Sequence, residues 1–110
     1  MINIEINRNY IGNVCRFTVD GHSGYEENGR DIVCAGVSTA TQSVILGMSE
    51  ILDIRLNIMI DEGHLDCEIP EISERLLLEK VNILLETMVL TLRQMAAEYP
   101  DFVKMIEVEE

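Results

Sequence analysis

Basic residues are scarce in this sequence. Its 110 residues include eight lysines and arginines against 20 aspartates and glutamates, which gives a net charge of −12. A surface this negative repels phosphate groups, so nucleic acid is a poor direct partner. A basic peptide or protein would be attracted to it, although the same charge could serve solubility alone.

Paired cysteines and glycine-rich nucleotide motifs are missing as well. Three cysteines are an odd number, which argues against a closed disulfide framework. The sequence has no C-x2-C pair of a zinc ribbon, no Gly-Lys-Ser/Thr phosphate loop and no dinucleotide glycine fingerprint. His64 and Cys67 are three residues apart on a predicted strand, so they point to opposite faces and cannot hold one ion. We therefore expect no metal and no cofactor.

Signals for export or a membrane are also lacking. The apolar run at 81–85 is far too short to cross a bilayer. Residues 1–6 alternate like a strand and carry no basic leader. Because 47% of the residues are hydrophobic, the chain can build one core. We expect a single domain over residues 1–110, located in the cytoplasm.

Hydrophobic periodicity predicts the order of the elements. Short alternating segments predict strands, and two longer apolar patterns predict helices. The expected strands are 2–7, 14–20, 54–61, 65–69 and 102–108, and the expected helices are 31–53 and 73–99. The order β-β-α-β-β-α-β predicts an α+β domain with two helices on one face of a mainly antiparallel sheet.

The same patterns give expectations about packing. Cys15 and Cys67 lie on the apolar faces of their strands, where a cysteine behaves as a small buried hydrophobe. Glycine weakens a helix, so Gly36 and Gly47 in the first helix suggest close packing against a neighbour. The inward face of strand 54–61 is expected to consist of Ile54, Leu56, Ile58 and Ile60.

The second helix is apolar around much of its circumference. Ile83, Leu84 and Met88 are expected to face the sheet, so a second apolar group needs another cover. That second group consists of Leu77, Val81, Leu85 and Val89. The first helix or a second subunit could cover it, and we expect a dimer with part of this helix in the interface.

An imidazole and a thiol stand twelve residues apart, at His22 and Cys34. Gly24 and Gly29 lie in the loop between them, and Gly21 directly precedes His22. Cys34 falls in or beside the first turn of a helix, where free N–H groups and the helix dipole favour a thiolate. His22 could take the thiol proton if the loop folds back. The other interpretation is a plain loop histidine and a buried cysteine.

Several neighbours have open roles. Asp31 either orients His22 as a third catalytic group or caps the helix. Ser38, one turn beyond Cys34, either hydrogen-bonds near the thiolate or is an ordinary helix serine. Glu26, Glu27 and Asp31 either attract lysines of a substrate or only keep the loop hydrated.

The stretches from Gly21-His22 to Gly29, from Asp31 to Ala35, and Val37-Ser38 resemble the signature of the ribosomal-processing cysteine proteases (Prp). The resemblance spans 18 positions, and the expected order of elements agrees along the whole chain. It implies a homodimeric cysteine endopeptidase with a histidine–cysteine dyad, matched here by His22 and Cys34. The implied substrate is the N-terminal extension of a large-subunit ribosomal protein, cut after aromatic residues. Ser23 stands where relatives often carry Ala.

The sequence thus predicts a cysteine protease that acts during ribosome assembly. Cys34 attacks the scissile carbonyl, and His22 moves the proton. The backbone N–H groups of Cys34 and Ala35 are candidates for an oxyanion hole, and the loop 21–30 is expected to close over the peptide. The alternative is a non-catalytic acidic module that docks on a basic ribosomal protein and needs no reactive thiol.

Overall fold

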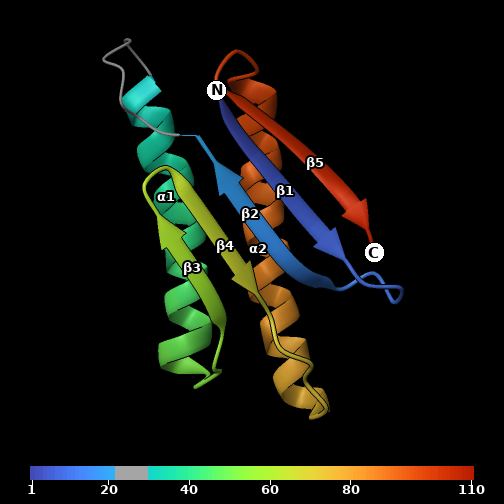
Figure 1. Cartoon of the computed structure of the whole chain (residues 1–110). Coiled ribbons are helices and arrows are strands. Elements are labelled where there is room, and N and C mark those ends of the chain that lie inside the picture. Colours follow the sequence, from blue (N-terminus) through green and yellow to red (C-terminus); the bar gives the residue numbers. More distant parts are fainter. Residues whose placement is uncertain (22–29) are drawn as a thin grey trace.

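The computed structural model describes residues 1–21 and 30–110. Two helices alternate with strands in the order expected from the sequence: each helix follows a pair of strands, and a fifth strand comes last (Figure 1). The elements are β1 (Ile2–Arg8), β2 (Val14–Asp20), α1 (Arg30–Leu46), the π-helical turn η1 (Gly47–Ile51), β3 (Asn57–Asp61), β4 (His64–Glu68), α2 (Arg75–Glu98) and β5 (Val103–Glu109). The predicted α+β order is confirmed.

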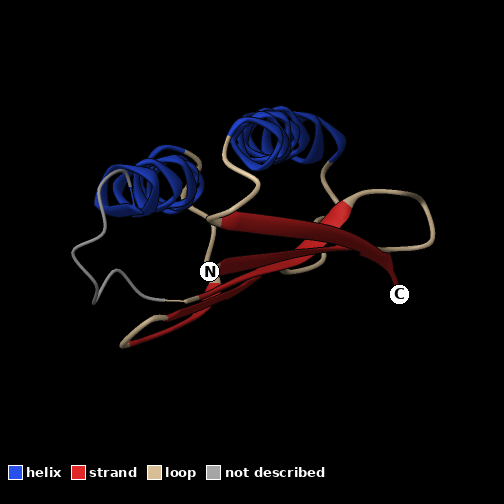
Figure 2. Cartoon of the chain, turned by 90° about the horizontal axis from the view of Figure 1, so that it is seen from above, coloured by secondary structure: helices blue, strands red, loops and turns tan. Residues whose placement is uncertain are grey.

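The five strands form one sheet in the order β3-β4-β2-β1-β5. The pairs β1–β2, β2–β4 and β3–β4 are antiparallel, and only β1–β5 is parallel. Both helices lie on the same face of this sheet (Figure 2). The predicted mainly antiparallel sheet with helices on one face is therefore confirmed, and β3 and β5 are its two edges.

The core lies between the central strands and α2. The register places Ile6, Phe17 and Cys67 side by side across β1, β2 and β4, and all three are fully buried. Against them pack residues of both helices: Val33, Val37 and Val44 of α1, and Val81, Leu85, Met88, Val89 and Leu92 of α2. The prediction for Cys67 is confirmed, and burial raises the pKa of its thiol to about 12.

The prediction for Cys15 is wrong, because the strand pairing is irregular there. Arg16 pairs with Asn7, whereas Val14 pairs with Arg8, so Cys15 is an extra residue at a β-bulge. The bulge turns Val14 into the core and leaves Cys15 half-buried. Its Sγ lies 3.4 Å from the carbonyl oxygen of Asn7.

The assignment of the two faces of α2 is confirmed for Met88, which is buried, and wrong for Ile83, which is exposed. Val81, Leu85 and Val89, expected to need a second cover, are buried against the sheet. Apolar residues occupy more than one side of this helix, so periodicity alone does not show which side meets the sheet. The exposed large apolar residues of α2 are Leu76, Ile83 and Leu90.

Strand β3 is shorter and more exposed than predicted. It begins at Asn57, so Ile54 and Leu56 lie before it, with Ile54 buried. Ile58 and Ile60, expected to face the core, are exposed, Ile60 at 69%. The reason for the exposure of Ile60 is that β3 is an edge strand and a cleft separates Ile60 from α1.

The run at 81–85 is not the longest uncharged stretch of the chain, because one helical segment is long and apolar enough to cross a membrane by length and composition alone. The helical segment Ile32–Ile51 has 20 residues and a mean hydropathy of 1.4. Core helices of globular domains meet the same criteria, and the apolar side of this segment packs on the sheet through Val33, Val37, Val44 and Met48.

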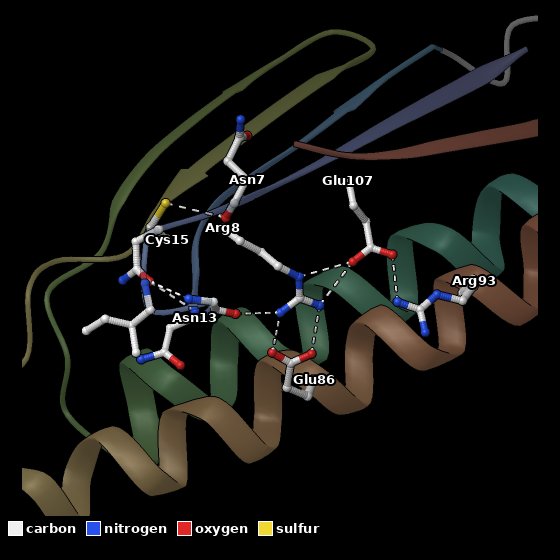
Figure 3. Close-up of polar contacts among 10 residues, drawn as sticks. Asn7, Arg8, Asn13, Cys15, Glu86, Arg93 and Glu107 are labelled. Atoms are coloured by element: carbon white, nitrogen blue, oxygen red, sulfur yellow. Dashed lines mark hydrogen bonds and ion pairs between the residues drawn. The ribbon is translucent and has the colours of Figure 1, made fainter. Parts of the chain in front are cut away.

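A cluster of charges ties α2 to the two strands beside it (Figure 3). The Arg8 guanidinium donates two hydrogen bonds to Glu86, of 2.6 and 2.9 Å, and one of 3.1 Å to Glu107. Glu107 also accepts a 2.6 Å hydrogen bond from Arg93. These bonds, chiefly those with Glu86, raise the pKa of Arg8, so β1, α2 and β5 share one charged anchor.

We expect Arg8→Met to lower the free energy of unfolding by about 2 kcal/mol, because it removes charge-assisted hydrogen bonds from a half-buried site. Arg75→Met is the matched control, since Arg75 is 90% exposed and lies 3.6 Å from Glu79. An exposed pair of this kind contributes at most about 0.5 kcal/mol. Urea unfolding measures both, and equal losses would contradict the anchoring role.

Candidate active site

Cys34 faces a cleft between α1 and the β3–β4 hairpin. The cleft has a volume of about 380 Å³, and Cys34, Val37 and Ser38 form its α1 side. Cys34 is half-buried on the second turn of the described helix and packs against the edge of the core. Its sulfur can therefore be reached from the cleft while the backbone that carries it is held by a regular helix.

Ser38 lies one turn beyond Cys34 and lines the same cleft. Its hydroxyl oxygen accepts a 2.9 Å hydrogen bond from the side chain of Gln42. Within the described part of the chain the Ser38 hydroxyl proton has no acceptor, so it can be donated toward the cleft. The neighbouring Thr41 is committed elsewhere, because its hydroxyl lies 3.0 Å from the carbonyl oxygen of Val37.

Gly21 fixes the place where the chain leaves β2. It has a φ of 120°, and its N–H donates a 3.0 Å hydrogen bond to the carbonyl oxygen of Gly63 in the β3–β4 turn. A Cβ atom at this position would lie 2.4 Å from the carbonyl oxygen of Met1 and 3.0 Å from the Cα of Ile2. Only glycine, which has no Cβ, fits this close to the backbone of Met1 and Ile2.

A side-chain pair reinforces this junction. The imidazole Nδ1 of His64, at the start of β4, is hydrogen-bonded to the carboxylate of Asp20, at the end of β2. This bond with Asp20 raises the pKa of His64, so the pair is charged below that pKa and weakens as the pH rises through it. Together with the Gly21–Gly63 bond, the pair holds the end of β2 against the hairpin turn.

Several predicted site residues lie outside the described residues. They are His22, Gly24, Glu26, Glu27 and Gly29, so the dyad geometry and the closing of loop 21–30 remain predictions. Asp31 lies inside α1 and not at the N-cap predicted for it, because the helix already includes Arg30. Its role beside the histidine also remains a prediction.

The helix geometry bears on the expected oxyanion hole. In an α-helix each N–H bonds to the carbonyl four residues earlier. Since α1 includes Arg30 and Asp31, the N–H groups of Cys34 and Ala35 point at the carbonyls of those two residues. Either N–H group could donate a hydrogen bond to an oxyanion only if this first helical turn opens in the substrate complex.

The hairpin side of the cleft was not found from the sequence. Val19 of β2, Ile60 of β3 and Leu65 of β4 line it, together with the turn from Asp61 to His64. The glycine in that turn was the only local signal. Bringing the hairpin beside Cys34 requires β4 to pair with β2, and hydrophobic periodicity does not give strand neighbours.

Comparisons with known proteins agree with this arrangement. The family model described as cysteine protease Prp matches residues 1–104. The ribosomal processing cysteine protease Prp of Bacillus subtilis (strain 168) is 32% identical over 107 residues, covering 92% of this chain and 92% of the relative.

Two crystal structures share the whole fold. One is a protein of Streptococcus mutans, with 28% identity and a TM-score of 0.87, covering 100% of this chain and 96% of the other. The other is the essential ribosomal processing protease Prp of S. aureus in complex with a substrate peptide. It has 26% identity and a TM-score of 0.84, covering 97% of this chain and 99% of the other.

We expect Gly21→Ala to destabilise the fold more than Gly12→Ala. Both glycines have positive φ, 120° and 100°, so both alanines carry backbone strain of about 1–3 kcal/mol. Only the Gly21 variant also collides with backbone, since nothing lies within 4 Å of a Cβ at Gly12. Thermal unfolding of the two variants measures the difference. If Gly12→Ala lost as much stability, the tight junction at Gly21 would be disproved.

Proposed function

The chain belongs to the cysteine protease Prp family, and we propose that it removes the N-terminal extension of a large-subunit ribosomal protein during ribosome assembly. Membership of the family makes the chain a cysteine protease. The proposed substrate is supported by relatives named as ribosomal processing proteases. Within the molecule, the proposal is carried by Cys34, which opens into a cleft beside the point where the chain leaves β2 toward His22.

Cys34 and His22 form the proposed dyad. His22 takes the proton of the Cys34 thiol, and the thiolate attacks the scissile carbonyl. The protonated imidazole then gives this proton to the leaving amine, which leaves an acyl group on the sulfur. Water, activated by the same imidazole, hydrolyses the thioester and frees the second product. Ser38, which lines the same cleft, is the candidate donor to the sulfur.

Cys34 is the best nucleophile of the three cysteines. Cys67 is fully buried, and its pKa is raised to about 12. Cys15 lies at the other end of β2, where burial, followed by the nearby Glu110, raises its pKa. Only Cys34 lines the cleft. A non-catalytic binding module would not need an accessible thiol in a cleft.

The negative charge fits a basic protein substrate. Asp61 and Glu62 line the hairpin side of the cleft, and Glu26 and Glu27 belong to the preceding loop in the sequence. Attraction between this surface and a basic ribosomal protein would act mainly on association and would weaken with salt. The proposed function also places the protein in the cytoplasm, where ribosomes are assembled.

We further propose that two copies associate through the outer face of the helix layer. Leu76, Ile83 and Leu90 recur every seven residues on α2 and are 61–68% exposed. Beside Ile83, an apolar hollow of about 250 Å³ is lined by Gly47 and Ile51 on the neighbouring helical segment. Exposed apolar side chains that gather on one face in this way are typical of an interface. The predicted dimer is thus kept, with a different face of α2.

Cys34 should be the first cysteine to react with iodoacetamide at neutral pH, followed by Cys15 and last by Cys67.

Cys34→Ala should abolish peptide cleavage and keep the fold. His22→Ala should lower kcat by roughly 10²–10⁴-fold, as expected for loss of a general base. Cys15→Ala is the control and should cleave normally. Mass mapping and single-turnover assays test this, and normal kcat in the histidine variant would remove His22 from the mechanism.

Ile83→Glu should convert the dimer to a monomer, because it places a charge in the proposed apolar interface. Tyr10→Glu is the control, since Tyr10 is 85% exposed but lies on the β1–β2 turn, outside the row of Leu76, Ile83 and Leu90. Sedimentation at about 50 μM separates the two states, a concentration that matters because dimers dissociate on dilution. A wild-type chain that sediments as a monomer there would refute the interface.

A further inference from the structure

Asp20 and His64 form a pair on the face of the sheet that lies opposite the helices (Figure 2). The register sets the two residues side by side at one end of β2 and β4. A carboxylate can only accept a hydrogen bond, so Nδ1 of the imidazole is the donor to Asp20. The preceding and following residues, Val19 and Leu65, line the cleft on the helix side. Because successive side chains of a strand point to opposite faces, the pair points away from the helices, although His64 also borders the cleft at the hairpin turn.

The pair stands directly before the residue at which β2 ends. Gly21 follows Asp20, and its N–H donates a 3.0 Å hydrogen bond to the carbonyl oxygen of Gly63, which precedes His64. On its other side Gly21 lies so close to the backbone of Met1 that a Cβ atom has no room. One side-chain bond, one backbone bond and one close backbone contact therefore hold this point of the chain. The strand end cannot shift without breaking one of them.

This junction connects the sheet to the proposed dyad. Gly21 and Gly63 line the same cleft as Cys34. His22 is the next residue in the sequence, joined to Gly21 by one peptide unit with about 3.8 Å between the Cα atoms. A movement of Gly21 away from the hairpin turn is therefore passed directly to the backbone of His22, while Cys34 stays with its helix.

We infer that Asp20 and His64 are positioning residues of the enzyme: their pair holds Gly21 against the hairpin turn and so sets where the backbone of His22 begins relative to Cys34. This inference rests on the proposed function. The pair acts through Gly21 and transfers no proton to the substrate. A catalytic group that is misplaced by about 1 Å can cost on the order of 100-fold in rate, so losing the pair should affect catalysis in a protein that still folds.

A second pair between the same two strands offers a matched control. Arg16 of β2 donates a 2.9 Å hydrogen bond to Asp66 of β4. It lies four residues before Asp20 and therefore on the same face of the sheet. Removing either pair should cost some stability, as for any cross-strand pair of opposite charge. Only the loss of the Asp20–His64 pair releases the residue next to Gly21.

The test measures kcat, KM and the rate at which iodoacetamide alkylates Cys34 at neutral pH, all in the full chain. His64→Ala should lower kcat by about 10-fold or more and change KM by less than about 2-fold, because orientation and not binding is lost. Alkylation of Cys34 should slow with kcat, because a displaced imidazole no longer takes the thiol proton. His64→Asn should restore most of both rates, since its side-chain N–H takes the place of Nδ1–H.

Two further variants complete the test. Asp20→Ala should match His64→Ala, and the double variant should be no slower than either, because both changes remove the same bond. Arg16→Met should keep the wild-type kcat and the wild-type alkylation rate even where thermal unfolding shows a loss of stability.

Other outcomes would overturn the inference. Equal losses of rate in Arg16→Met and His64→Ala would make the pair an ordinary part of the sheet, as would unchanged rates in His64→Ala. An inactive His64→Asn variant would give the imidazole a direct role in place of a positioning one. The proposed function is tested separately by the wild type: a chain that neither alkylates at Cys34 nor cleaves any peptide is not a protease of this kind.

Discussion

The packing of α2 on the central strands decides where the other parts of the molecule lie. Ile6 and Phe17 on the sheet and Leu85 and Leu92 on α2 are fully buried, so this contact excludes water completely. With the middle of the sheet occupied, α1 lies to one side of α2 (Figure 2). The hairpin strand β3 is therefore left partly uncovered, and the cleft opens between it and α1. The cleft beside Cys34 exists because α2 packs on the middle of the sheet and α1 lies to one side of it.

Two glycines set the distance between the helices. A Cβ on Gly36 would lie 2.8 Å from the terminal methyl carbon of Met95, and one on Gly47 would lie 3.3 Å from a methyl carbon of Leu84. These contacts explain why residues that weaken a helix occur inside α1 and η1. Since Gly36 follows Cys34 by two residues, the packing that places α1 against α2 also sets the position of Cys34, the proposed nucleophile.

The sequence predicted the elements well and their surroundings less well. Alternation and helical periodicity are local, so the order of strands and helices and the burial of Cys67 followed from them. The close packing at Gly36 followed from the low helix propensity of glycine. The bulge at Cys15, the exposed face of α2 and the open edge at Ile60 depend on pairing between distant strands. The same limit applies to the site. Cys34 could be singled out by its place at a helix start, but the hairpin opposite it could not be placed without the sheet order.

The parallel pairing of β1 with β5 has a consequence for how the protein is made. The first strand of the sheet finds one of its two neighbours only in the last, with Ile2 beside Val103 and Arg8 beside Glu109. While the chain is being synthesised, that side of β1 stays open until β5 has emerged. Contacts this distant in sequence slow folding and leave partly formed sheets exposed to aggregation. The sheet is therefore completed only after its other four strands have been synthesised.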